Sequence, residues 1–187
     1  HGNLTITQAC KALGLDVETV ISDLEQVLES NEMHSMIDAP AYMPPRALVQ
    51  HIAERYHLPL RDVLPHVTTL AATVARADGE EDPSLVELSH AVAKLSAFLL
   101  EHIDEEERTV FPMIMAGQGD PTLVKAAARG LFTEYEQVSA QLRDIRALAK
   151  DFEVPGWADE EHQALLLELE ALEHDIHEHV LLENNAL

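Results

Sequence analysis

Two stretches of the sequence place a histidine and a glutamate four residues apart. The first is "EHIDEEERTVFPMI" (residues 101–114), with His102 and Glu106, and the second is "HEHVLLENNAL" (residues 177–187), with His179 and Glu183. Residues at i and i+4 share one face of a helix, so each pair can offer an imidazole nitrogen and a carboxylate oxygen to the same point. These donor atoms suit iron, manganese or zinc. One such pair on an acidic helix is common, whereas its repetition indicates a metal site.

Helical periodicity places both pairs on stripes that are otherwise apolar. One stripe consists of Leu88, Val92, Leu95, Leu99, His102, Glu106, Val110 and Met113, and the other of Leu165, Leu169, Leu172, Ile176, His179 and Glu183. The same spacing gives two more stripes, one with His57 between Val49 and Val74, and one with Tyr135 between Val124 and Ala149. Taken alone, His57 is more typical of a hydrogen-bonded core histidine, and Tyr135 of a core tyrosine whose hydroxyl has a partner.

No Lys or Arg lies on these four stripes to neutralise the carboxylates. A buried carboxylate without a partner costs several kcal/mol and usually takes up a proton instead. A pair of metal ions neutralises two such groups at once, and the interiors of helical bundles hold di-iron or di-manganese centres built in this way. The stripes therefore predict a metal pair ligated by His and Glu side chains.

The elements that must position these residues are four long helices. The first runs from about Arg46 to Arg76, and Pro59 and Pro65 are expected to bend or interrupt it. The second and third open at the dipeptides 82–83 and 120–121, both Asp-Pro, and the fourth opens near Asp159. Four segments of similar length predict an all-α, up-down-up-down four-helix bundle over residues 41–187. Two short helices around Gly14 predict a small helical N-terminal domain over residues 1–40, followed by a proline-rich linker.

Helix geometry places the candidate ligands at one level of such a bundle. At ~1.5 Å per residue, His57 lies about 18 Å from the start of its helix and Tyr135 about 21 Å from the start of the third. His102 lies roughly 20 Å before the end of the second helix, which runs the opposite way. The fourth helix reaches the same level only if it continues about a turn beyond Leu187. The chain begins at His1 without a Met, and we expect further residues before it.

Composition narrows the class of partner. The formal net charge is −22, with 34 acidic residues against 12 Lys and Arg, so the surface repels nucleic-acid backbones and attracts cations. No apolar run approaches the ~20 residues that cross a bilayer, so no membrane contact is expected. Cys10 is the single cysteine, which excludes an intramolecular disulfide and favours a cytoplasmic protein. We interpret Cys10 as a small buried residue.

The segments "AERYHLPLRDVLPHV", "EHIDEEERTVFPMI" and "HEHVLLENN" resemble the hemerythrin-like domain of the repair-of-iron-centres (RIC) di-iron proteins. The segment "HGNLTITQACKALGLD" is similar to the small domain that precedes it in that family. The resemblance implies two iron ions in a non-haem centre with carboxylate bridges and an oxo or hydroxo bridge. It implies as ligands His57, His102, Glu106, His179 and Glu183. It further implies a nitrosative and oxidative stress response in which damaged iron–sulfur proteins regain their clusters.

The sequence departs from the family's pattern at three points. Family members usually have a histidine where "FTEYEQ" places Tyr135, and often one near the end of the first helix, where Asp78 stands. The family's N-terminal pair of cysteines is either absent or lies before His1, and Cys10 is the single cysteine of the given sequence. Because phenolate binds ferric iron, we expect Tyr135 to be a sixth ligand.

Three functions are compatible with the sequence. The chain repairs or supplies iron to iron–sulfur centres, or it binds nitric oxide or oxygen without turnover, or it is a zinc-bound or metal-free bundle that acts through protein contacts. The sequence does not decide whether the protein is an enzyme. It also leaves the oligomeric state open, and a homodimer is one candidate.

Overall fold

The computed structural model describes residues 6–22, 43–116 and 121–186, and these residues form helices and turns without a strand. The predicted all-α class is therefore confirmed. The chain divides into two compact units, His1–Tyr42 and Met43–Leu187. The boundary predicted between residues 40 and 41 stays a prediction, because residues 23–42 lie outside the described ranges. Across the described residues, no helix is both long and apolar enough to cross a membrane.

The first unit contains α1 (Ile6–Leu13) and a second helical segment over residues 17–22. Gly14 joins them with φ +69°, a left-handed conformation that glycine adopts without steric cost. The Cys10 side chain is buried, as the sequence predicted.

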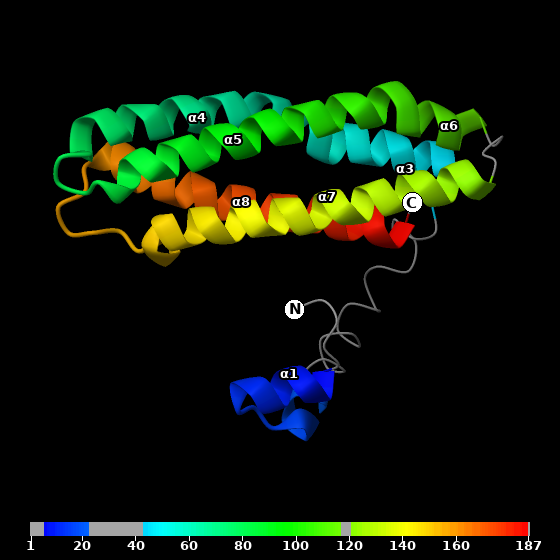
Figure 1. The fold of residues 1–187 in the computed structure, drawn as a ribbon, viewed down its shortest axis with the longest axis horizontal. Coiled ribbons are helices and arrows are strands. Elements are labelled where there is room, and N and C mark those ends of the chain that lie inside the picture. The colour runs from blue at the N-terminus through cyan, green and yellow to red at the C-terminus, as the bar shows by residue number, and fades with distance from the viewer. Residues whose placement is uncertain (1–5, 23–42, 117–120, 187) are drawn as a thin grey trace. The chain divides into compact units, whose positions relative to one another are not determined.

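The second unit is a bundle of long helices. Its α-helices are α3 (Pro45–Ile52), α4 (Leu58–Asp78), α5 (Ser84–Glu105), α6 (Phe111–Ala116), α7 (Pro121–Leu148) and α8 (Glu160–Ala186). A π-helical turn, Ala53–His57, joins α3 to α4, and a second, Glu106–Val110, joins α5 to α6. In this unit α4 packs against α5 and α8, and α7 also packs against α5 and α8 (Figure 1). This arrangement is the predicted four-helix bundle.

The helix starts follow from capping side chains. The backbone N–H and the hydroxyl of Ser84 donate to Oδ1 of Asp82, at 3.1 and 2.7 Å, where α5 begins. At the start of α8, the N–H of His162 donates to Oδ1 of Asp159 at 2.8 Å. Both predicted aspartate caps are thus confirmed, since each satisfies an N–H that the first turn of a helix leaves unpaired. Pro121 is the first residue of α7, and Asp120 lies outside the described residues.

Each π-helical turn ends two residues before a proline. The N–H of Leu58 bonds to the carbonyl of Ala53, five residues back, and Pro59 follows; the N–H of Phe111 bonds in the same way to Glu106, and Pro112 follows. A proline has no N–H, and its ring crowds the carbonyl four residues earlier, which favours a wider preceding turn. The predicted interruption of the first helix therefore occurs before Pro59. Pro65 does not interrupt the helix, because α4 continues through it.

Two clusters of buried apolar side chains form the core of the bundle. The larger contains residues of α4, α5, α7 and α8 and two residues of the turn after α7, Ala149 and Phe152. The helical members are Leu60, Leu64, Val67, Ala71, Val74, Leu85, Leu88, Val92, Leu95, Leu99, Ile103, Val138, Leu142, Ile145, Leu165, Leu166, Leu169, Leu172 and Ile176. The smaller contains Leu48, Val49, Ile52 and Phe111. Where α3 joins α4 and where α5 joins α6, a buried polar residue lies between the two apolar clusters. These are His57, between Ile52 and Leu60, and Glu106, between Ile103 and Phe111.

The π-helical turn at Glu106–Val110 corrects the predicted stripe of the second helix. Val110 and Met113 were expected in the core, but both are half-buried, whereas Phe111 is 3% exposed. A π-helical turn holds one residue more than an α turn, so the inward position after Glu106 is five residues on and not four.

Candidate metal centre

Helix α8 contributes His179 and Glu183, which lie one turn apart on its buried face. Nε2 of His179 lies 2.7 Å from Oε1 of Glu183, and the two side chains are 2% and 5% exposed. Regular α-helical geometry is sufficient to align this pair, because residues at i and i+4 are neighbours.

His57 is the last residue of the first π-helical turn, and its side chain is fully buried. Its Nε2 lies 3.3 Å from Oε2 of Glu106 and 3.8 Å from Oε1 of Glu183. Its Nδ1 points the other way and lies 2.9 Å from Oε1 of Glu107. The ring therefore presents one nitrogen to the interior of the bundle and the other to a carboxylate at its edge.

His102 and Glu106 come from the junction of α5 with the second π-helical turn. Nε2 of His102 lies 3.5 Å from Oε2 of Glu106 and 4.0 Å from Oε2 of Glu183. Glu106 is buried, whereas the side chain of His102 is 11% exposed. His102 therefore lies at the margin of the group and adjoins solvent.

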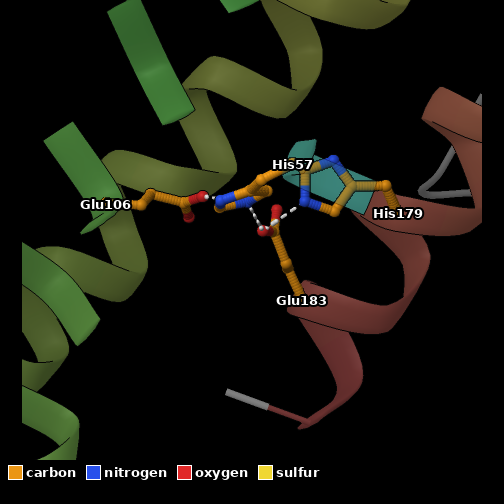
Figure 2. A group of neighbouring side chains, drawn as sticks. All are labelled: His57, Glu106, His179 and Glu183. Carbon is orange, nitrogen blue, oxygen red and sulfur yellow. Dashed lines mark ion pairs between the residues drawn. The ribbon is translucent and has the colours of Figure 1, made fainter. Parts of the chain in front are cut away.

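Four of these side chains converge from three helices. His57, Glu106, His179 and Glu183, here called the His/Glu cluster, each place one possible ligand atom so that all four atoms lie within 4.8 Å of one another. Figure 2 shows the four side chains pointing toward a common region between their helices. A single metal ion has bonds of about 2 Å to such atoms, so the separation matches ligands that share one ion or two adjacent ions.

The polar atoms of the His/Glu cluster form ion pairs, with His179 and Glu183 at 2.7 Å, but five of these atoms are not aligned for a hydrogen bond. No described residue provides a hydrogen-bond partner for Nε2 of His57 or His179, for either carboxylate oxygen of Glu106, or for Oε1 of Glu183. Buried polar atoms are nearly always hydrogen-bonded, so five unsatisfied atoms in one place require an explanation. Imidazole nitrogens and carboxylate oxygens that converge without forming hydrogen bonds to one another fit the coordination of a metal cation.

The pKa values of the metal-free cluster reflect close packing of charges in a buried place. Burial raises the pKa of Glu106, and the charge of Glu183 adds to the effect. Burial also opposes ionisation of Glu183, but contacts with His102, His179 and His57 hold its pKa well below the usual range. For His57, burial lowers the pKa, but contacts with the Glu106, Glu183 and Glu107 carboxylates outweigh burial and raise it to about 9. In the metal-free chain a proton on His57 thus supplies part of the positive charge that the carboxylates require.

Two aromatic rings cover the histidines. The ring of Phe111 stacks on His57 with centroids 5.3 Å apart, and the ring of Tyr56 stacks on His179 at 5.1 Å. Tyr56 belongs to the first π-helical turn, and Phe111 follows the second. The same two turns that place His57 and Glu106 therefore also place the rings that restrict the imidazole planes.

The six residues predicted from the sequence do not all meet in the described structure. Four form the His/Glu cluster, and His102 adjoins it. Tyr135 lies on α7 with a half-buried side chain, and no described residue forms a hydrogen bond with it, so its ligation stays a prediction. Sequence reasoning missed Glu107, which was assigned to solvent but accepts a hydrogen bond from His57. It also missed His162, which is buried and bonds through Nδ1 to Asp78 at 2.9 Å.

Residues 46–187 match the model of the hemerythrin family, described as the hemerythrin HHE cation binding domain. The chain therefore belongs to the hemerythrin HHE family, which confirms the resemblance found in the sequence. It is also similar to the "Iron-sulfur cluster repair protein YtfE" of Yersinia pseudotuberculosis, with 30% identity over 190 residues that span 100% of this chain and 82% of the relative. The "Iron-sulfur cluster repair protein ScdA" of Staphylococcus haemolyticus is 27% identical over 188 residues, which span 100% of this chain and 83% of that protein.

Proposed function

We propose that the bundle holds a non-haem di-iron centre and that the protein restores damaged iron–sulfur clusters by supplying iron. The observation that carries this proposal is the His/Glu cluster, in which two buried carboxylates and two imidazoles converge and leave five polar atoms unsatisfied. The family supports a cation as the occupant, and the names of the relatives support iron–sulfur cluster repair as the role.

The proposed ligands divide by position in the fold. His57, Glu106, His179 and Glu183 hold the metal in the interior, and His102 completes the set from the margin of the bundle. Glu183 approaches His57 and His179 with Oε1 and His102 with Oε2, which suits a carboxylate that bridges two ions. Tyr135 is the proposed sixth ligand. Bound iron supplies the chemistry of the site, as ferrous ion that can be passed to an acceptor.

The residues of this chain have two tasks in such a role. The burial of Glu106 and Glu183 makes the metal-free carboxylates unfavourable, which favours uptake of a cation. The side chain of His102 is 11% exposed, so the proposed site adjoins solvent there. At this place an ion can leave without unfolding of the bundle. Since Cys10 is the single cysteine of the sequence, a reducing compartment suits the chain, and we assign this function to the cytoplasm.

Iron transfer to an acceptor tests the proposal. The iron-loaded protein is mixed anaerobically with an iron–sulfur dehydratase whose cluster nitric oxide has destroyed, with sulfide and a reductant present. Both this mixture and a control with an equal amount of free ferrous ion contain a chelator that captures free iron. We expect the acceptor to regain activity faster with the iron-loaded protein than in the control. The His179→Ala variant, prepared in the same way, is expected to give no such gain. Tight nitric oxide binding without recovery of the acceptor would instead favour a binding module without turnover.

A further inference from the structure

The two ring nitrogens of His57 have opposite surroundings. Nε2 faces the His/Glu cluster, 3.3 Å from Oε2 of Glu106, while Nδ1 donates to Oε1 of Glu107 at 2.9 Å. Glu106 and Glu107 are consecutive residues of the second π-helical turn. The turn thus places one carboxylate inside the bundle and the next one at its edge, with the imidazole of His57 between them.

We infer that Glu107 is a positioning residue for the metal centre and acts through His57. The inference rests on the proposed function in that it takes a metal as the occupant of the His/Glu cluster. A hydrogen bond from Nδ1–H fixes the proton on that nitrogen, so the lone pair of Nε2 is directed into the cluster. A carboxylate in this position also makes the imidazole a stronger ligand, and removing such a partner typically weakens metal binding 10–100-fold.

Arg61 and Asp104 hold the carboxylate of Glu107 in place. Nη2 of Arg61 lies 3.1 Å from Oε2 of Glu107, and Nη1 lies 2.7 Å from Oδ1 of Asp104. Arg61 therefore occupies the outer oxygen of Glu107 and leaves the inner oxygen to His57. The series of contacts Asp104–Arg61–Glu107–His57 crosses three times between the first and second long helices of the bundle.

The solvent exposure of these side chains argues that Glu107 positions His57 and does not have a mainly structural role. Arg61, Asp104 and Glu107 are 34%, 59% and 39% exposed. Ion pairs as exposed as these contribute little to stability. Among the contacts of these residues, only the hydrogen bond that Glu107 accepts comes from a fully buried group, the imidazole of His57. Its effect should therefore appear in metal binding more than in the melting temperature.

Titration of the full chain with Co²⁺ tests the inference without any iron–sulfur acceptor. The variants are Glu107→Ala, Glu107→Gln and, as the matched control, Glu105→Gln. Glu105 belongs to the same long helix, is exposed and pairs only with Arg108 among the described residues. We expect Glu107→Ala to bind Co²⁺ about 10–100-fold more weakly than the wild type, as for other such partners of ligating histidines. Glu107→Gln should lose less, because its amide oxygen still accepts from Nδ1–H, and Glu105→Gln should match the wild type.

Nitrogen NMR of the Zn²⁺-loaded chain supplies a readout that a structural role would not change. In the wild type, the Nδ1–H of His57 should be observed and should exchange slowly with water, while in Glu107→Ala it should exchange faster. Equal Co²⁺ affinity in Glu107→Ala and Glu105→Gln, or an unchanged Nδ1–H exchange rate, would overturn the inference. Wild-type protein that takes up neither metal would overturn it together with the proposed function. Normal metal uptake without iron transfer to an acceptor would reject the repair function alone.

Discussion

Nε2 of His57 lies 3.3 Å from Oε2 of Glu106, and the two residues stand at the end and the start of π-helical turns on neighbouring helices. Each turn adds one residue to the helical register, and each ends two residues before a proline. The two helices therefore change register at the same level of the bundle, where the core gives way to the His/Glu cluster. Both π-helical turns depart locally from regular α-helical geometry, and each of them carries a candidate ligand.

Replacing Pro112 by alanine tests the link between proline, turn and ligand position. Alanine at 112 can donate to the carbonyl four residues back and so favours a regular α turn. The metal-free chain should become more stable, by up to ~3 kcal/mol on helix propensity, while metal affinity falls because Phe111 and Glu106 lose their relative register. Chemical denaturation and Co²⁺ titration measure the two effects.

Pro65→Ala is the matched control, because Pro65 is also exposed and lies inside the regular helix α4. It should raise stability without changing metal affinity. Equal Co²⁺ affinities for Pro112→Ala and Pro65→Ala would show that the proline after the turn does not position the ligands.

These turns also mark the limit of what the sequence reveals. On α8 the helix is regular, and the predicted stripe of Leu165, Leu169, Leu172, Ile176, His179 and Glu183 is buried throughout. On the second helix the same reasoning failed after Glu106, because a π-helical turn obeys no 3.6-residue period. The X-Pro dipeptides 58–59 and 111–112 are the available signal, but Pro65 shows that proline alone does not predict the turn.

The polar partners were harder to predict than the stripes. Glu107 was assigned to solvent, since an α-helix turns it about 100° away from Glu106 and its bond to His57 depends on tertiary packing. His162 received no role, because its partner Asp78 is 84 residues away in the sequence. Spacing within one helix identifies residues that share a face, whereas pairs across helices depend on register between helices.

Substitution of Glu106 by glutamine separates a metal ligand from a structural carboxylate. The pKa of Glu106 is raised, chiefly by burial, so the neutral amide should leave the metal-free chain as stable or make it more stable. Metal at about 1,000 times its dissociation constant stabilises a wild-type fold by ~4 kcal/mol, and this gain should be largely lost in Glu106→Gln. Thermal unfolding with and without Zn²⁺ measures both values.

Glu173→Gln is the control, because Glu173 is also buried but Arg146 binds both of its oxygens, with Nε at 3.2 and 3.0 Å. Removing this charge should destabilise the chain by roughly 1–3 kcal/mol with or without metal. A Glu106→Gln variant that keeps the full metal-induced rise in melting temperature would exclude Glu106 as a ligand.

Metal affinity should depend on pH through His57. Its pKa is about 9 in the metal-free chain, against 6.5 for an unperturbed histidine, so at pH 7 a metal must displace a proton from it. Apparent Co²⁺ affinity is therefore expected to rise by about tenfold per pH unit from pH 7 towards pH 9. Because the folded pKa is raised, the protonated His57 stabilises the metal-free fold below pH 6.5, and this contribution is lost as pH rises to 9.

Calorimetry in two buffers of different ionisation enthalpy counts the protons released on Co²⁺ binding. At pH 7 the count should include about one proton from His57, and it should fall towards zero above pH 9. An affinity that does not change over this range would contradict the protonation of His57 in the metal-free chain.

Tyr135→Phe tests the proposed sixth ligand. A phenolate bound to ferric iron gives a visible charge-transfer band, so the oxidised iron-loaded wild type should absorb in the visible and the variant should lose that band. Tyr56→Phe is the matched control, because Tyr56 stacks on His179 but lies outside the predicted stripe. The charge-transfer band should remain in the Tyr56→Phe variant. A spectrum that is the same in Tyr135→Phe and wild type would remove Tyr135 from the ligand set.

The metal content of the purified chain distinguishes a di-iron centre from a zinc site or a metal-free bundle. The protein is loaded with ferrous iron under anaerobic conditions, freed of unbound metal by gel filtration and analysed for iron and zinc per chain, with His179→Ala as the comparison. We expect two iron ions per wild-type chain and a large loss in the variant. Fewer than one iron per chain, or zinc retained in place of iron, would contradict it.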